Sequence, residues 1–194
     1  MDATPNTSGL LSPLTSKNFR WLFGGQIVST IGSQLSSMVM VALVLPNSER
    51  PALDIGLVMG ARYSALALFI VVGGVLADRV NRFKLLALTD ILSIVALVPI
   101  ILLGAATPIA VVVLSSFVLG ACEALFSPTY DAAIVSTVSK EQLAPANALT
   151  KTVRGFAKIV GPPLSGIVVA GVGVSSALVI DAISFGASIL SLSR

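Results

Sequence analysis

The sequence predicts an all-α integral membrane protein with six transmembrane helices. Of its 194 residues, 55% are hydrophobic and only 11% are charged, whereas about a quarter of the residues of a soluble domain are charged. Uncharged runs cover residues 91–122 and 159–180, and a membrane helix needs roughly 20 apolar residues. The alternative, buried core helices of a soluble protein, is disfavoured because the apolar pattern repeats along nearly the whole chain.

Turn-forming clusters divide the chain into its elements. The cluster at 46–51 (PNSERP) ends the first helix, and the charged stretch at 73–84 separates the second from the third. The long uncharged run is divided by GAATP at 104–108. A capping box at Ser139–Gln142 starts the fifth helix, and Gly171–Gly173 separates the fifth from the sixth. The expected spans are 21–45, 54–77, 85–103, 109–130, 142–170 and 174–193.

The distribution of Lys and Arg predicts the orientation of these spans. Residues 1–16 are polar and rich in Ser, Thr and Pro, which predicts a flexible tail rather than a signal peptide; the six-helix domain covers 17–194. Among the Lys and Arg residues in the connections, Arg50 is the only one expected on the side opposite the others. Cytoplasmic loops carry the excess of Lys and Arg, so both termini are expected in the cytoplasm. The residues on that side are Lys17, Arg20, Arg79, Arg82, Lys84, Lys140, Lys151, Arg154 and Arg194.

Several function classes are disfavoured by what the sequence lacks. One cysteine and no histidine leave neither a disulfide within the chain nor a Cys/His metal site. The chain carries no nucleotide-binding loop and no catalytic constellation. We therefore expect no enzyme activity, no cofactor, no metal and no nucleic-acid partner; the lipid bilayer is the expected environment.

The charged stretch between the second and third spans resembles a family motif. Gly74, Asp78, Arg79, Asn81 and Arg82 are similar to the loop between helices two and three of the major facilitator superfamily, with Asn81 in place of a glycine. Asn tolerates the left-handed conformation, so the turn is expected to persist. The resemblance implies a gating loop that latches two halves of a transporter, and Asp78 is expected to accept a hydrogen bond from Arg82. Alternatively, the cations only anchor the topology.

A second motif lies in the fifth span. Gly161, Pro162, Pro163 and Gly166 resemble the Gly-Pro-x-x-Gly-Gly motif of drug and proton antiporters of the same family, and Ser165 departs from it. The two glycines are expected to allow close backbone approach, and the prolines are expected to kink the helix. The alternative is tight packing without a role in transport.

Segments 123–128 and 146–149 extend the resemblance to the bacterial multidrug, macrolide and siderophore exporter branch. The resemblance covers residues 17–194 and corresponds to the amino-terminal half of a twelve-helix transporter, built from two three-helix repeats. It implies a second six-helix half as a partner, either a C-terminal half, a separate chain or a second copy. A fragment is the alternative. The implied location is the cytoplasmic membrane of a bacterium.

Charged residues within spans are costly and usually face a cavity or a partner. The fourth and fifth spans are antiparallel neighbours, so Glu123 and Lys158 are expected at similar depth and in an ion pair. Arg62 and Asp181 are expected to pair if the second and sixth spans touch. Asp131 is expected near the charged loop. The ions concerned are Arg62, Asp90, Glu123, Asp131, Arg154, Lys158 and Asp181.

Helical spacing predicts one face for a cavity. Gln26 and Gln34 share a stripe of the first span with Thr30, Ser33 and Ser37. The stripes on the other spans hold Ser116, Gly120, Glu123 and Ser127 in the fourth, and Arg154 and Lys158 in the fifth. The Ser, Thr and Gln side chains could instead bond helices together. Glu123 is the favoured proton-coupling residue, and a static ion pair is its alternative.

The expected function is secondary active export of small amphipathic molecules, such as drugs or siderophores, by proton antiport and alternating access. One alternative is uptake, or transport of lipid-like substrates, by the same fold. Another is a non-transporting or regulatory membrane component.

Overall fold

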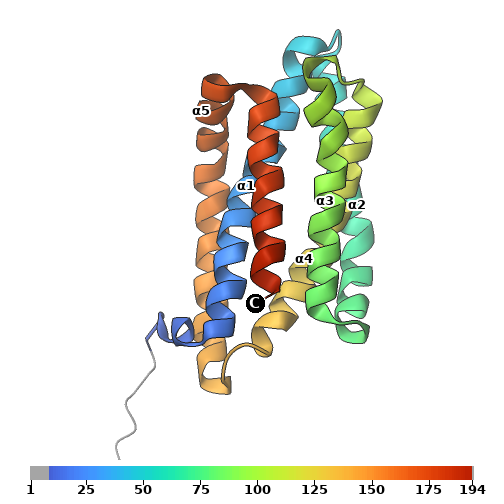
Figure 1. Cartoon of the computed structure of the whole chain (residues 1–194). Coiled ribbons are helices and arrows are strands. Elements are labelled where there is room, and N and C mark those ends of the chain that lie inside the picture. Colours follow the sequence, from blue (N-terminus) through green and yellow to red (C-terminus); the bar gives the residue numbers. More distant parts are fainter. Residues whose placement is uncertain (1–8, 194) are drawn as a thin grey trace, which may run out of the picture.

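The computed structural model describes residues 9–193, and the long elements among them are all helical (Figure 1). Residues 1–8 and 194 lie outside the described part. The bounds of the long helices are α1 Lys17–Asn47, α2 Pro51–Arg79, α3 Arg82–Leu103, α4 Ile109–Val135 and α5 Leu143–Leu192. Three short 3₁₀ helices join or precede them: η1 Ser12–Thr15, η2 Gly104–Ala106 and η3 Lys140–Gln142.

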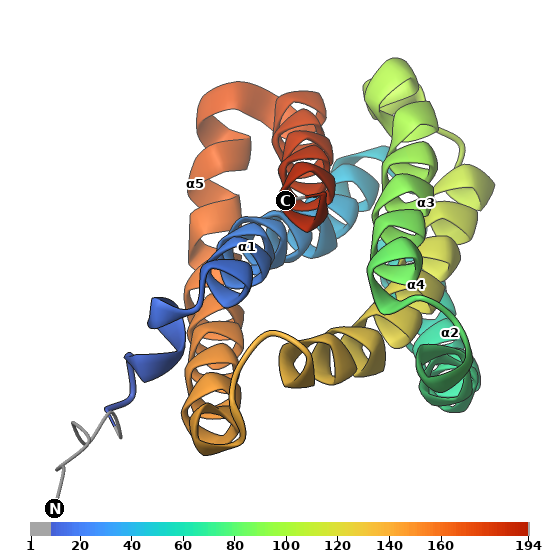
Figure 2. The same cartoon turned by 60° about the horizontal axis from the view of Figure 1, so that its bottom comes forward.

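Helix α5 is interrupted at Gly173, where φ is 81° and ψ is 169°. The chain reverses there, so that a first arm (143–172) and a second arm (174–192) lie side by side (Figures 1 and 2). The capping box expected at Ser139–Gln142 is present and opens η3 just before α5. Five helical segments of the described chain are long and apolar enough to cross a membrane, with α5 counted as one. The six-span assignment therefore stays a prediction.

The helices form two groups. Helix α1 packs chiefly against α5, and α2 packs chiefly against α4, while α3 contacts both α4 and α5 (Figure 2). Small residues set the closest approaches. A Cβ atom on Gly73 of α2 would lie 2.6 Å from the carbonyl oxygen of Ala124 in α4, so glycine is required for this spacing.

Two apolar clusters occupy opposite ends of the bundle. One contains Val39, Met40 and Leu43 of α1 with Leu97 and Ile100 of α3, and extends to residues of α2, α4 and α5. The buried members of the other are Phe19, Leu22, Phe23, Leu86, Tyr130, Ala133, Ile134 and Ala146. Along α1, α3 and α4, the polar stretch that holds the site lies between these clusters.

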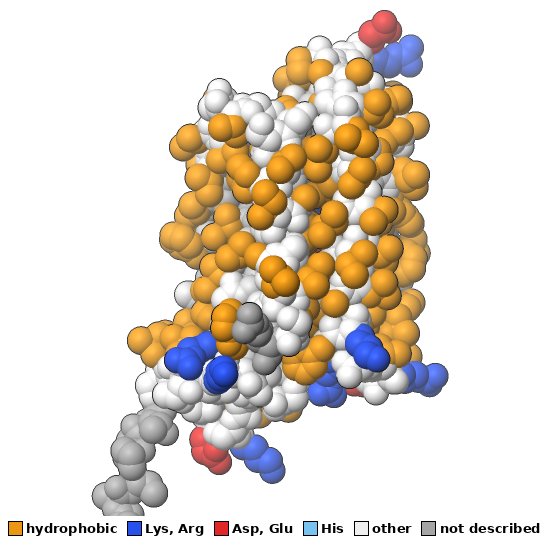
Figure 3. All heavy atoms as spheres, in the orientation of Figure 1, with side chains coloured by type: hydrophobic (Ala, Val, Ile, Leu, Met, Phe, Trp, Pro, Cys, Tyr) orange, Lys and Arg blue, Asp and Glu red, His pale blue; other side chains and the backbone are white. Residues whose placement is uncertain are grey.

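The side of the bundle is apolar and its ends are charged (Figure 3). Leu102 and Ile159 are 77% and 75% exposed, and many other large apolar side chains are exposed on all the long helices. Soluble monomers rarely expose large contiguous apolar patches, so this surface fits the hydrocarbon of a bilayer. The chain is a multi-pass membrane protein. Most Lys and Arg side chains in view gather at one end of the bundle in Figure 3, and the orientation of this end in the membrane stays a prediction.

Part of the predicted flexible tail packs against the bundle. Ser16 Oγ donates to the Thr137 carbonyl oxygen at 2.6 Å. Gln142 Nε2 donates to the Ser12 carbonyl oxygen at 3.0 Å and to Thr15 Oγ1 at 3.2 Å. These bonds attach η1 to the connection between α4 and α5.

Candidate functional site

A cavity of about 220 Å³ lies among all five long helices, between the two apolar clusters. Leu119, Phe126 and Phe185 provide its apolar wall. The remaining lining is polar and includes three acids and three bases. The polar and charged residues are Gln26, Ser29, Thr30, Ser33, Gln34, Ser36, Arg62, Thr89, Asp90, Cys122, Ser93, Glu123, Ser127, Arg154, Lys158 and Asp181.

The five residues predicted for the cavity all line it. They are Gln26, Gln34, Glu123, Arg154 and Lys158. Among the four predicted buried ions, Arg62, Asp90 and Asp181 are buried and line the cavity as well. Asp131 differs, because it is exposed and lies outside the lining.

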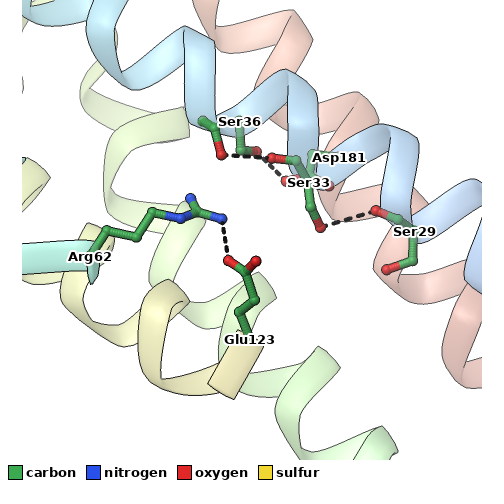
Figure 4. A network of polar contacts seen from close by, with 7 residues as sticks. Ser29, Ser33, Ser36, Arg62, Glu123 and Asp181 are labelled. Carbon is green, nitrogen blue, oxygen red and sulfur yellow. Dashed lines mark hydrogen bonds and ion pairs between the residues drawn. The ribbon is translucent and has the colours of Figure 1, made fainter. Parts of the chain in front are cut away.

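An ion pair joins α2 to α4 inside the cavity (Figure 4). Arg62 Nη2 donates to Glu123 Oε2 at 3.0 Å, and the two side chains are 10% and 47% exposed. Gly120 lies one turn before Glu123, and a Cβ atom there would collide with the backbone of Arg62. The missing side chain lets α4 approach α2 closely enough for this pair. The predicted pairs of Glu123 with Lys158 and of Arg62 with Asp181 are therefore wrong.

Asp181 is held by hydroxyl groups instead of by a cation. It is fully buried and accepts a hydrogen bond from Ser36 of α1 (Figure 4). It accepts a second hydrogen bond from Ser184, whose Oγ lies 3.1 Å from Oδ1. Gly32 of α1 faces the same carboxylate, since a Cβ atom there would collide with Asp181 and Ser184. Helix α1 therefore brings a hydroxyl, and no charge, to Asp181.

Asp90 lies on α3 and is 1% exposed. Its Oδ2 atom is buried and has no hydrogen-bond partner. Two further polar atoms of the cavity lining share this property: Gln26 Oε1 and Arg62 Nη1. Buried polar groups are usually hydrogen-bonded, so these atoms mark positions where a bound species can be held.

At the end of the cavity, Arg154 links the first arm of α5 to α4. Its Nη1 atom lies 3.2 Å from Asp131 Oδ1, and its Cζ atom lies 4.9 Å from the centroid of the Tyr130 ring. Asp131 thus pairs with Arg154, and among the described residues it has no bond to the charged loop. The cation–π contact fixes the guanidinium between an acid and an aromatic face.

The charged loop differs in two details from its prediction. Asn81 has φ −64° and ψ 115°, and its side chain caps α3 by accepting from the Lys84 backbone N–H at 3.2 Å. The expected left-handed conformation is therefore wrong, and an N-cap role explains this asparagine. Arg82 donates to the carbonyl oxygens of Ala77 at 3.4 Å and Ala132 at 3.2 Å, rather than to Asp78.

The antiporter-like motif contacts α1 through only one of its glycines. A Cβ atom on Gly161 would lie 2.5 Å from Gln34 Cβ, whereas one on Gly166 would meet nothing within 4 Å. Ser165 Oγ lies 3.3 Å from the Gln34 carbonyl oxygen, and it donates to the Gly161 carbonyl oxygen at 2.8 Å. The backbone stays helical at 162–163, and a kink at these prolines stays a prediction.

Some lining residues were missed by the sequence analysis. Thr89 and Ser93 flank Asp90 on α3, and their polarity on an otherwise apolar helix was a usable signal. Phe126 and Phe185 had no such signal, because an aromatic residue in an apolar helix is equally expected in the core or facing lipid.

Comparison with known protein families extends these observations. A family model described as transmembrane secretion effector matches residues 8–194, nearly the whole chain. The comparison with curated proteins found no match. The match covers every helix of the structure and all residues of the cavity. The chain therefore belongs to the transmembrane secretion effector family, whose members are transporters of the major facilitator type.

Proposed function

We propose that the chain is part of a secondary active transporter that exports small amphipathic molecules in exchange for protons. The observation that carries this proposal is the cavity, in which charged and aromatic side chains face one space between two apolar clusters. Charges inside a membrane protein are expensive and usually serve a transport path. A lining with both ions and phenylalanines suits a substrate with one polar and one apolar part.

Alternating access in this proposal uses a second six-helix half, either a C-terminal half or a second copy of the chain. The charged loop supports a latch between the halves. Asp78 and Arg79 are exposed, and neither side chain has a hydrogen bond or an ion pair within residues 9–193. Their charges are therefore available to a partner, while Arg82 fastens the loop to the end of α4.

The proposed orientation places both termini in the cytoplasm of a bacterium. It is tested with the Asn81→Cys variant in a Cys122→Ser background. A membrane-impermeant maleimide is expected to label position 81 in inside-out vesicles and not in intact cells. Labelling only in intact cells would reverse the orientation, and the direction of transport with it.

Transport is tested in inside-out vesicles with ethidium, a fluorescent amphipathic cation, and an acidic vesicle interior. The expected result is accumulation of ethidium that a protonophore abolishes and that vesicles without the chain do not show. Accumulation only in right-side-out vesicles would support uptake. No transport in either orientation, with a strict monomer in detergent, would support a non-transporting component.

A further inference from the structure

We propose that Asp90, rather than Glu123, binds the coupling proton, and that Asp181 is the charged neighbour with which it shares the buried end of the cavity. This inference rests on the proposed function, since a coupling proton requires transport. It assigns a role to the one carboxylate of the cavity that has neither a cation nor a full set of hydrogen bonds.

Glu123 already has a counter-ion. Arg62 Nη2 lies 3.0 Å from Glu123 Oε2, and the arginine side chain is only 10% exposed. A proton on Glu123 would leave this buried guanidinium without its partner, which is strongly unfavourable. Binding and release of a proton at Glu123 would therefore require the pair to break in each cycle.

Asp90 has no such partner. It is 1% exposed, it lines the cavity, and its Oδ2 atom has no hydrogen-bond partner. No ion pair reaches it from any helix of the described chain. An ionised carboxylate in this position is costly, and one bound proton removes that cost.

Every long helix contributes polar or charged groups to the lining of the cavity. Helix α1 supplies Gln26, Ser29 and Ser36, which are neutral. Helix α2 supplies Arg62, which forms an ion pair with Glu123. Helix α4 supplies Cys122 and Glu123. The first arm of α5 supplies Arg154 and Lys158, and the second arm supplies Asp181. Ser188 of the second arm also interacts with the Asp90 carboxylate through its hydroxyl group.

The two buried aspartates differ in how their charge is held. Asp181 accepts hydrogen bonds on both carboxylate oxygens, from Ser36 and from Ser184. Asp90 lies within electrostatic range of Asp181, so two adjacent negative charges would repel each other in a low-dielectric site. One proton on the pair relieves this repulsion, and Asp90 is the member whose Oδ2 atom is free to take it.

The proposed step is a simple proton transfer. A hydronium ion on the outer side gives up one proton and becomes water, the proton forms an O–H bond with Asp90 Oδ2, and the carboxylate becomes neutral. When the cavity faces the cytoplasm, the same proton returns to water and the carboxylate becomes charged. Because Asp90 lines the cavity, the proton and the substrate occupy one space, which is the condition for exchange of one against the other.

Infrared difference spectroscopy of the full chain in lipid tests protonation without any substrate. Stepping the pH is expected to change a carbonyl band of a protonated carboxylic acid. The band is expected to disappear in Asp90→Asn, to shift in Asp90→Glu, and to persist in Glu123→Gln. Loss of the band in Glu123→Gln with persistence in Asp90→Asn would overturn the proposal. A band suppressed by replacing K⁺ with Na⁺ at fixed pH would assign the site to sodium and overturn it too.

A transport measurement separates failure of this inference from failure of the proposed function. Two activities are measured in proteoliposomes: ethidium accumulation driven by a pH gradient, and ethidium counterflow, which needs no proton. Asp90→Asn is expected to lose the gradient-driven accumulation, and Asp90→Glu, which keeps a carboxylate, is expected to retain it. Gradient-driven accumulation by Asp90→Asn at the level of the unmodified chain would overturn the inference alone. Absence of both activities in the unmodified chain would overturn the proposed function, while the infrared band still decides whether Asp90 binds a proton.

Discussion

Two adjacent glycines near the end of α2 allow a direct test of how α2 packs on α4. A Cβ atom on Gly73 would lie 2.6 Å from the carbonyl oxygen of Ala124 and 3.0 Å from the Cα atom of Leu125. A Cβ atom on Gly74 would meet nothing within 4 Å. The motif singled out by resemblance contains Gly74, whereas the structure places the steric constraint at Gly73.

The expected magnitude follows from these contacts. To reach an ordinary separation of 3.4 Å, the Ala124 oxygen must move by 3.4 − 2.6, or 0.8 Å, and it belongs to the backbone of α4. Overpacking of this kind costs about 1–3 kcal/mol. Replacing glycine by alanine inside a helix gains about 0.5–1 kcal/mol, and both positions lie within α2. Because this gain is common to both variants, their difference isolates the collision: Gly73→Ala is expected to be about 1–3 kcal/mol less stable than Gly74→Ala.

The assay is unfolding in mixed micelles by increasing SDS, followed by circular dichroism for both variants and the unmodified chain. Gly74→Ala is expected to unfold at an SDS fraction equal to or above that of the unmodified chain, and Gly73→Ala at a lower one. Equal stabilities of the two variants would refute the argued packing of α2 against α4.

Three further predictions concern the ion pair, the reversal of α5 and the N-terminal contact. In the same unfolding assay, Glu123→Gln is expected to destabilise the chain by about 1–3 kcal/mol. The loss is expected to exceed that of Arg62→Met, because Glu123→Gln leaves the more buried partner, the arginine, without a counter-ion. The reverse order of stabilities would contradict this pair. Gly173→Ala is expected to cost about 1–3 kcal/mol, because its φ and ψ are nearly exclusive to glycine. Gly171→Ala meets no neighbour within 4 Å and is expected to be neutral or to gain up to about 1 kcal/mol; equal losses in the two variants would contradict the assigned backbone. Gln142→Ala is expected to speed proteolysis of residues 9–16, since two hydrogen bonds to η1 are lost, and an unchanged cleavage rate would show that this contact does not hold the segment.

The ends of the helices could be predicted from the sequence because local chemistry decides them. The expected break at 104–108 coincides with η2, where Gly104 has φ 54°. The expected break at 171–173 coincides with the reversal at Gly173. Both turns need a backbone conformation that glycine adopts without strain. Asn81 was placed correctly in a turn, but its role as an N-cap depends on where α3 starts, and a single position does not reveal this.

The ion pairs could not be predicted, because depth along a helix is only one of the coordinates that bring two side chains together. The number of residues along each helix placed Glu123 and Lys158 at similar depth in the membrane. It did not determine the rotation of either helix about its axis or which helices are neighbours. Gly120 could have indicated the neighbouring helix, since a glycine one turn before Glu123 marks a position where a second helix can approach α4. The structure shows that this helix is α2 at Arg62.

The composition of α1 explains why the cavity is left with two acids that no cation neutralises. The cavity contains three acids and three bases, and a simple count predicts that they cancel. Arg62 forms an ion pair with Glu123, and Arg154 forms an ion pair with Asp131, which lies outside the cavity. The second arm of α5 packs against α1, which carries no charge after Arg20. Asp181 therefore meets serine hydroxyls, and Asp90 on the neighbouring α3 meets no cation.

Among the residues that the structure describes, Lys158 is the base of the cavity lining that forms no ion pair with an acid. It lies exposed on the first arm and has no ion-pair partner within residues 9–193. The lining thus carries a cation on the first arm and uncompensated acids on α3 and the second arm. Since the pairing is decided by which helices touch, a lysine or arginine in the middle of α1 would be expected to form an ion pair with Asp181 and neutralise it. The absence of charge in the middle of α1 leaves Asp181 with serine hydroxyls as its hydrogen-bond donors.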